Sequence, residues 1–207
     1  MVNRTNSQFV RNFSKEIMEK LQKKYNKEII PALQKRFGYK NPMAVPRITK
    51  VTLNSSFGKN TVSKTSGERE KVQNFILADL ALIAGQRPKL VKSKKSIAGF
   101  KLREGLEIAA MVTLRKQKMW DFLERFIYLS LPRSRDFQGL NPNSIDQRGN
   151  MNIGFREHIS FPEIFIEKEK MIFGLEVTIS TNAKNKEEGE ELFRLLGLPL
   201  KVKVSGK

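Results

Sequence analysis

The sequence predicts an α+β fold, with a mainly antiparallel sheet and helices packed on one face. The predicted elements run helix, strand, helix, strand, strand, helix, strand, strand, helix, so the later strands come in hairpin-like pairs. Hydrophobic residues make up 39% of the 207 residues, enough for one sizeable core. We expect one domain over residues 24–203, a helical or partly disordered basic extension over 1–23, and a short tail over 204–207.

The N-terminal region is predicted to be helical over residues 8–37, because apolar residues recur there at helical spacing. Pro31 lies inside this pattern and predicts either a kink or a second helix that begins near it. Gly38 is placed to end that helix. A polar, Arg-containing stretch precedes the first acid at Glu16, so an organellar transit segment stays an alternative for this region.

The next elements are a strand and a capped helix. A β-branched run over 47–54 predicts the first strand, and the polar residues 55–66 predict a loop. Thr65 and Glu68 form a capping-box pattern that opens a helix, which Gly85 is placed to end.

A basic hairpin is predicted in the middle of the chain. Residues 89–94 alternate as a short strand, residues 94–99 form a basic turn, and residues 100–115 return as a longer strand with a break near Gly105.

The C-terminal half continues with a helix over 119–131, apolar on most sides and ended by Pro132, and a long surface loop over 133–148. Two further strands are predicted over 149–161 and 174–182.

The last predicted helix spans residues 187–196, with Asn185 and Glu188 as a second capping-box pattern and Gly197 at its end. We interpret its four glutamates, Glu187, Glu188, Glu190 and Glu191, as a solvated surface.

The formal net charge of +18 favours a polyanionic partner, which is most often nucleic acid. The charge is uneven, since residues 1–40 carry net +7 and residues 87–118 carry net +8. A merely solvated surface is the alternative. The sequence contains no run of about 18 apolar residues, so no membrane span is predicted. The absence of cysteine excludes disulfides and thiolate sites and fits a reducing, intracellular compartment.

Catalytic chemistry finds little support in the sequence. Neither a phosphate-binding glycine loop nor a dinucleotide fingerprint occurs. The single histidine, His158, falls in a predicted strand, and with no cysteine it cannot build a usual zinc site. It could pair with Glu157 or Glu163 for acid–base work, but we interpret it as structural or surface-exposed. We therefore predict no catalytic residue, no metal and no cofactor.

The most distinctive cluster of charged residues is the segment from Arg87 to Arg103. This segment holds seven cationic side chains and no acid. Strand alternation would put Lys92 and Lys94 on one face, while small residues in the turn let backbone approach phosphate. Phe100 could stack on a base or ribose, or could anchor the hairpin; the sequence leaves both open.

These residues carry a resemblance. The run S-K-K-S-I-A-G-F-K-L-R-E-G (93–105) resembles the signature loop of the bacterial-type large-subunit ribosomal protein L-five family. The similarity covers about residues 24–203 and continues in order through V-P-R-I-T-K-V-T-L-N (45–54), L-I-A-G-Q-R-P (82–88), V-T-L-R (112–115), M-W-D-F-L-E-R (119–125), L-P-R-S-R-D-F-Q-G-L (131–140), D-Q-R-G-N (146–150), F-P-E-I (161–164) and G-L-E-V-T-I-S-T (174–181).

The resemblance implies a non-enzymatic constituent of the large ribosomal subunit that takes part in translation. Such proteins lie in the central protuberance and bind 5S rRNA and adjacent 23S rRNA. They contact peptidyl-site tRNA through the basic loop and bridge to small-subunit ribosomal protein S-thirteen. The implied place is the cytoplasm, in the ribosome, with an organellar ribosome left open, and no membrane or DNA partner is implied.

The resemblance also implies residue roles. The rRNA contacts would be Asn54, Gln86, Thr113, Arg115, Arg47, Lys89 and Lys92. The tRNA-facing loop would hold Lys94, Lys95, Ser96, Gly99, Phe100, Lys101 and Arg103. The small-subunit bridge would use Arg133, Arg135, Asp136, Phe137 and Gln138, with residues 146–150 as a further candidate.

Two departures from the family pattern stand out. The usual glycine-rich stretch after T-L-N is Ser55-Ser56-Phe57-Gly58 here, so the backbone approach to RNA can differ, and about 20 extra residues precede the usual start. Two other functions stay open: a basic RNA-binding module that acts outside the ribosome, for example on a free 5S particle, and an RNA-directed enzyme that uses His158.

Overall fold

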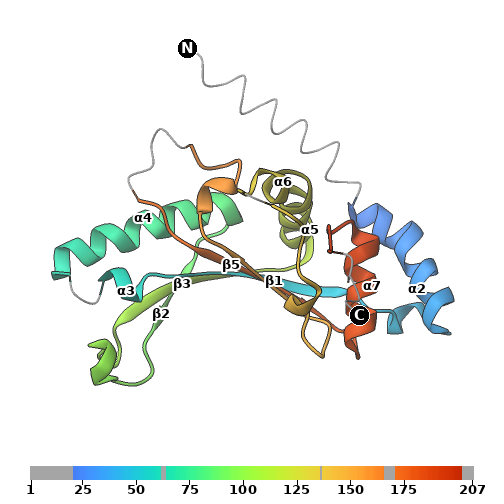
Figure 1. The fold of residues 1–207 in the computed structure, drawn as a ribbon, viewed down its shortest axis with the longest axis horizontal. Helices are drawn as coiled ribbons and strands as arrows, with labels where there is room; N and C mark the ends of the chain where they lie inside the picture. Colours follow the sequence, from blue (N-terminus) through green and yellow to red (C-terminus); the bar gives the residue numbers. More distant parts are fainter. Residues whose placement is uncertain (1–20, 62–63, 136, 166–170, 202–207) are drawn as a thin grey trace, which may run out of the picture. The chain divides into compact units, whose positions relative to one another are not determined.

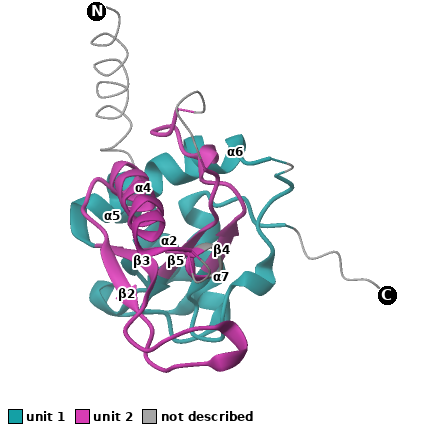
Figure 2. Cartoon of the chain, turned by 90° about the vertical axis from the view of Figure 1, so that its left-hand side faces the viewer, with its two compact units in different colours: residues 1–50, 115–151, 180–207 teal, residues 51–114, 152–179 magenta. Residues whose placement is uncertain are grey.

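The computed structural model describes residues 21–61, 64–135, 137–165 and 171–201 (Figure 1). The chain forms two compact units (Figure 2). Unit 1 comprises residues 1–50, 115–151 and 180–207, and unit 2 comprises residues 51–114 and 152–179. The first 20 residues lie outside the described part, so the predicted N-terminal extension and its boundary stay predictions.

A five-stranded sheet runs in the order β2-β3-β1-β5-β4. Its strands are β1 (Ile48–Ser56), β2 (Lys89–Lys92), β3 (Glu107–Leu114), β4 (Met151–Phe155) and β5 (Leu175–Thr181). Strands β1 and β2 both pair with β3 in antiparallel fashion, and the sheet confirms the predicted antiparallel α+β class.

Helix α4 (Ser66–Ala84) covers one face of the sheet in unit 2 (Figure 1). The predicted Thr65–Glu68 capping box is present, and Gly85 ends the helix in the left-handed conformation with φ 62°. The buried residues of α4 include Ile76, Leu80 and Ile83, which face the core because they share one side of the helix.

Alternation along β1 and β3 decides which strand residues join that core. Leu53 lies opposite Val112 and both are buried, whereas Thr52 opposite Thr113 is half-buried. The short helix α3 (Gly58–Thr61) approaches Ile108, which points to the same face of β3 as Val112 because the two are four residues apart. In the described part of unit 2, α3 and α4 therefore both lie on the core face, and the face of Thr52 stays open.

Unit 1 is mainly helical. Residues 21–24 are helical and lead into a π-helical turn, η1 (Tyr25–Ile29), and then into α2 (Ile30–Phe37). The second segment thus begins beside Pro31, as predicted, and Gly38 ends it with φ 70°. The long apolar helix comprises α5 (Lys116–Arg125), the π-helical η4 (Phe126–Ser130) and α6 (Leu131–Arg133), and α7 (Lys186–Leu196) follows near the C-terminus.

Several predicted boundaries were wrong. The strand predicted over 100–115 begins only at Glu107, because Leu102 bridges back to Ile97. The predicted break near Gly105 is confirmed, since Gly105 turns with φ 78°. Strand β4 ends at Phe155, so His158 lies in a 3-10 turn (His158–Ser160) instead of a strand.

Other differences concern helix ends and loops. Pro132 lies within the last helical segment, which ends one residue later at Arg133. The loop predicted over 55–66 holds the end of β1 and α3, and the loop predicted over 133–148 holds a 3-10 turn at Pro142–Ser144.

The predicted cap of α7 was only partly right. Asn185 is the N-cap residue but its side chain makes no capping bond, and Oε2 of Glu188 instead accepts from the backbone N–H of Lys184 at 2.9 Å. Glu188 and Glu191 are buried, so the prediction of a solvated surface was wrong for these two. Both glutamates find polar partners in the N-terminal part of unit 1, at Tyr39 and Arg36.

None of the helices in the described residues is both long and apolar enough to cross a membrane.

Candidate nucleic-acid interface

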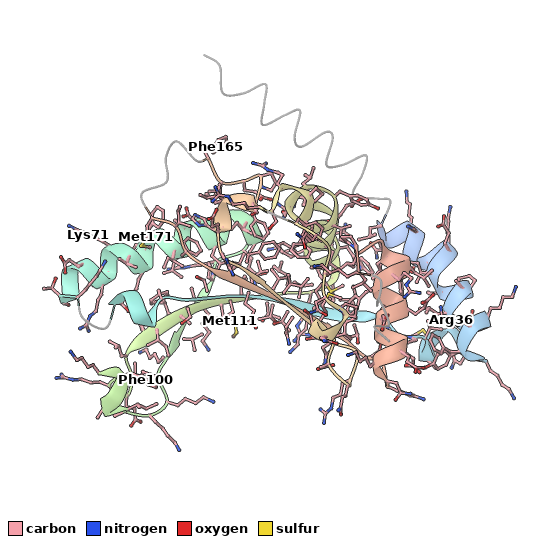
Figure 3. All side chains as sticks on the ribbon, viewed as in Figure 1. Arg36, Lys71, Phe100, Met111, Phe165 and Met171 are labelled. Atoms are coloured by element: carbon pink, nitrogen blue, oxygen red, sulfur yellow. The ribbon has the colours of Figure 1, made fainter. Side chains whose placement is uncertain are left out.

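A row of side chains crosses the open face of the sheet in unit 2. The strand register places Lys89 of β2 opposite Met111 of β3, and Met111 opposite Asn54 of β1. The Nδ2 amide of Asn54 donates to Oε2 of Glu176 on β5 at 3.4 Å, which extends the row to a fourth strand. Met111 points away from α4 (Figure 3), as its register requires.

A second row lies beside the first and is made of hydroxyl groups. Thr113 faces Thr52 across β3 and β1, and both are half-buried. Thr178 is two residues from Glu176 on β5, so its side chain points to the same face of the sheet. Hydroxyl and amide groups both donate and accept hydrogen bonds, which suits ribose 2′-hydroxyls and base edges.

The two rows hold only two charges, Lys89 and Glu176, and these have opposite sign. The open sheet face is therefore polar but nearly neutral. Such a surface can recognise RNA by shape and ribose contacts, whereas phosphate attraction must come from residues around it.

Unit 2 also exposes cations and an amide in the segment between α4 and β2 and at the end of β2. Gln86 and Arg87 are exposed directly after α4, and Lys92 is exposed at the end of β2. A register shift between Val91 and Lys92 sets Lys92 opposite Glu107, so part of the Lys92 charge is offset across the strands.

The basic loop between β2 and β3 is closed by hydrogen bonds at its base and near its tip. The backbone of Ser93 bonds to Leu106 at 2.8 Å and to Gly105 at 3.0 Å. Ile97 and Leu102 exchange two backbone bonds of 2.9 and 3.1 Å. The 3-10 turn Ala98–Phe100 then reverses the chain, with Lys101 at φ 51°.

Two serines stiffen the loop from within. The hydroxyl of Ser93 donates to the carbonyl of Lys95 at 2.8 Å, and the hydroxyl of Ser96 accepts from the backbone N–H of Glu104 at 2.9 Å. Because these bonds use the serine oxygens, the loop holds its shape without a hydrophobic core. Ser96, predicted to face tRNA, therefore also has a structural role.

The tip of the loop presents an aromatic ring among cations. Phe100 is 74% exposed and Ile97 is 45% exposed, so Phe100 does not anchor the hairpin, and the stacking alternative is the one consistent with its exposure. Figure 3 shows Phe100 at the end of the loop. All seven residues predicted for the tRNA-facing loop are exposed: Lys94, Lys95, Ser96, Gly99, Phe100, Lys101 and Arg103.

The remaining predicted contacts belong to unit 1 and are not part of the open sheet face. Arg47 is exposed, and its backbone N–H donates to Oδ1 of Asn182 at 2.6 Å. Arg115 is exposed just before α5.

Of the predicted bridge residues, Arg133, Arg135 and Gln138 are exposed and Phe137 is half-buried, while Asp136 lies outside the described residues.

The second bridge candidate, residues 146–150, is a hydrogen-bonded turn. Oδ1 of Asp146 accepts from the backbone N–H groups of Arg148 at 2.9 Å and Asn150 at 2.7 Å. Burial acts to raise the pKa of Asp146, but the hydrogen bonds from Asn150 and Arg148 outweigh it and lower the pKa. Within this turn, Gln147 and Arg148 have exposed side chains that take no part in its hydrogen bonds, and the bridge role of the turn stays a prediction.

His158 is fully buried in unit 2 and lies in a 3-10 turn instead of the predicted strand, so of the two predicted interpretations the structural one holds and surface exposure does not. Its Nε2 lies 3.6 Å from Oδ2 of Asp79 on α4, and its ring stacks on Phe173 at 3.9 Å between centroids. A histidine enclosed in this way holds the 3-10 turn against α4 and has no access to a substrate. In the described residues, no cluster of potential metal ligands occurs.

Sequence reasoning missed four residues of the open sheet face: Thr52, Met111, Glu176 and Thr178. Strand alternation around the predicted Asn54 could have found Thr52, since residues two apart share a face. Met111 and Glu176 needed the order of strands in the sheet, which local sequence does not encode.

Comparison with known proteins identifies the family of the chain. Residues 41–103 match the family model described as "Ribosomal protein L5", and residues 107–200 match the model for the C-terminus of the same ribosomal protein family. The chain is 48% identical over 184 residues to the large ribosomal subunit protein uL5 of Dichelobacter nodosus, which covers 89% of this chain and 99% of that protein.

Two further relatives are similar over the same extent. The uL5 proteins of Desulforapulum autotrophicum and Colwellia psychrerythraea are each 49% identical to the chain, over 186 and 187 residues. They cover 89% and 90% of this chain and 99% and 100% of their own lengths. The chain therefore belongs to the ribosomal L5 family, and it is a structural, non-enzymatic constituent of the large ribosomal subunit.

Proposed function

We propose that the chain binds 5S rRNA and adjacent 23S rRNA in the central protuberance, contacts peptidyl-site tRNA through its basic loop, and bridges to small-subunit protein S-thirteen. The observation that carries the proposal is that unit 2 has two surfaces of different chemistry. A nearly neutral polar sheet face and a strongly cationic loop occur on the same compact body, with different chemistry.

The open sheet face suits a folded RNA such as 5S rRNA. Asn54 keeps its Oδ1 as an acceptor while its Nδ2 donates to Glu176, and Thr52 and Thr113 each offer a hydroxyl. These groups match ribose 2′-hydroxyls, which distinguish RNA from DNA. Lys89 at the end of the row supplies a phosphate contact.

The basic loop suits a second, separate RNA partner. Its backbone is held by internal hydrogen bonds, so little conformational entropy is lost when it binds. The exposed ring of Phe100 can stack on a base or ribose while Lys94, Lys95 and Lys101 contact phosphates. These features support the tRNA contact that the family resemblance implies.

The bridge to S-thirteen rests on the exposed residues that follow α6. Arg133 and Arg135 are exposed, and Gln138 accepts from Nζ of Lys201 at 3.4 Å. Arginines favour planar, bidentate contacts to carboxylates, which fits a protein partner as well as RNA.

The proposal is tested by 5S rRNA binding to the full chain and to two sets of variants. The Asn54→Ala/Thr113→Val double variant removes one amide and one hydroxyl from the sheet face, and Asn143→Ala, on an exposed 3-10 turn, is its control. We expect the double variant to bind 5S rRNA at least tenfold more weakly and the control to bind normally. Equal binding by all three proteins would contradict the sheet-face assignment.

The loop is tested separately with Lys94→Ala/Lys95→Ala/Lys101→Ala. We expect this triple variant to keep most of its 5S rRNA affinity but to lose protection of peptidyl-site tRNA in footprinting of reconstituted ribosomes. Equal loss of both activities would show that the two surfaces are not separate.

A further inference from the structure

We infer that the outer side of the helical segment Leu21–Phe37, together with Lys40, is a third RNA-binding surface, which holds ribose-phosphate backbone without reading sequence. It lies entirely in unit 1 and shares no residue with the sheet face or the basic loop. It does not depend on which RNA occupies those two sites.

Core packing fixes the direction in which this segment presents its lysines. Leu21, Tyr25, Ile29 and Leu33 recur every four residues and are all buried. The Tyr25 hydroxyl also donates to the carbonyl of Pro46 at 3.0 Å, and its ring lies 5.5 Å from that of Trp120. The opposite side of the helix is therefore held toward solvent.

Lysines occupy that outer side. Lys23, Lys27 and Lys35 are exposed and fall at intervals of four and eight residues, and Lys40 is exposed just beyond the helix. At a rise of about 1.5 Å per residue, the line from Lys23 to Lys35 extends about 18 Å, long enough to follow several phosphates of one strand.

Few acids lie beside this stripe. Glu28 is the single acid among residues 21–40, against six Lys or Arg. On α7, Glu191 pairs with Arg36, and Glu188 accepts from the Tyr39 hydroxyl at 2.6 Å. Within the described part of the chain, the ammonium groups of Lys27, Lys35 and Lys40 have no ion-pair partner.

The outer side of α7 is an ordinary solvated helix face, and its charges differ from those of the lysine stripe. Its outer residues mix Lys186, Glu187, Glu190 and Arg194, and Arg194 pairs with Glu190 one turn away. Like charges four residues apart, such as those of Lys23 and Lys27, repel each other on a helix surface. A polyanion would relieve this repulsion.

The chemistry of the stripe favours phosphate over bases or lipid. Apart from the lysines and the paired Arg36, the exposed residues of Leu21–Phe37 are Asn26, Glu28, Pro31 and Ala32. None of them is an aromatic ring for base stacking or a Leu, Phe or Trp for insertion into a bilayer. Lysine is a flexible point charge, which binds phosphates with little demand for geometry.

The test compares full-length proteins on two probes, 5S rRNA and a 20-base-pair RNA duplex of unrelated sequence. The variant is Lys27→Gln/Lys35→Gln/Lys40→Gln. The charge-matched control is Lys64→Gln/Lys71→Gln/Lys186→Gln, at positions outside all the proposed surfaces. The Lys27→Arg/Lys35→Arg/Lys40→Arg variant keeps the charge, and circular dichroism with thermal melting checks that all four proteins fold.

We expect the stripe variant to bind both RNAs at least tenfold more weakly than wild type near 100 mM salt. Its slope of log K against log salt should be shallower by about 2 to 3, because each lost phosphate contact removes about 0.9. The arginine variant should bind as wild type does, and the control should change both affinities equally and only slightly.

The inference is overturned if the stripe variant loses no more affinity than the control, even though wild type binds 5S rRNA tightly. That result would leave the proposed function intact. If wild type ignores 5S rRNA but the stripe variant still loses duplex binding, the proposed function fails and the inference stands. Loss of binding to phosphatidylserine vesicles, with RNA binding unchanged, would assign the stripe to membranes and also overturn it.

Discussion

The side-chain amide of Asn54 donates to the carboxylate of Glu176 across β1 and β5, at 3.4 Å, in the middle of the open sheet face. This contact places one negative charge on a surface that we propose faces RNA. It orients Asn54, but its charge also repels nearby phosphates. The balance between these two effects can be measured.

Replacing Glu176 by Gln is expected to strengthen 5S rRNA binding about two- to fivefold at low salt, because the repulsion is removed while an acceptor oxygen stays near Asn54. The gain should shrink as salt is added. Fluorescence anisotropy at two salt concentrations checks this. Weaker binding by the variant would mean that the carboxylate itself accepts hydrogen bonds from the RNA.

Replacing His158 by Ala should destabilise the fold by about 2–4 kcal/mol, because it leaves a cavity beside Phe173 and removes a partner of the buried Asp79. Urea unfolding measures the loss, and Arg156→Ala, at an exposed position nearby, is the control. The folded variant should bind RNA normally. A catalytic turnover that disappears with His158 would instead revive the enzyme hypothesis.

Gly189 of α7 allows the turn at Gly149 to pack directly against the helix. A Cβ atom added to Gly189 would lie 2.5 Å from the Cα of Gly149, so backbone must move to accept it. We expect Gly189→Ala to destabilise the protein by about 3 kcal/mol or more. Gly154→Ala, where a Cβ meets nothing within 4 Å, should cost far less in the same unfolding assay.

The Tyr39–Glu188 contact predicts a loss of stability in alkali. Burial and the hydrogen bond to Glu188 raise the pKa of Tyr39 from 10.0 to about 12. The neutral phenol is thus favoured in the folded state, so its contribution is complete below pH 10 and is lost as pH rises toward 12.

The Tm of the Tyr39→Phe variant should therefore fall less than the Tm of wild type when the pH is raised from about 9 to about 11. Tyr25, whose pKa is also raised by burial, stays in both proteins and provides a common background. Identical alkaline losses in the two proteins would show that the Tyr39 hydroxyl does not couple to stability.

Local sequence signals correctly predicted the helices that are bounded by a capping box or by a glycine at the C-terminal end. The Thr65–Glu68 box and the left-handed glycines at 38, 85 and 197 set helix ends correctly, because capping chemistry acts over only a few residues. The strand predicted from Phe100 was too long, since its apolar residues also fit the bridge that closes the basic loop.

Long-range relationships were harder to predict. The burial of His158 and Glu188 depends on partners 79 residues away on α4 and 149 residues away at Tyr39, which no local pattern reveals. The same holds for Glu176, whose place on the open face follows from the strand order. The basic turn of the loop is exposed because a basic, glycine-containing turn cannot form a core, and the tRNA-facing role of its residues stays a prediction.

The most direct test of the account is the salt dependence of 5S rRNA binding by the full chain. A basic surface that contacts about six phosphates should give a slope of log K against log salt near −5. A flat response, or no binding at low ionic strength by a properly folded protein, would contradict the claim that the cations of this chain hold RNA.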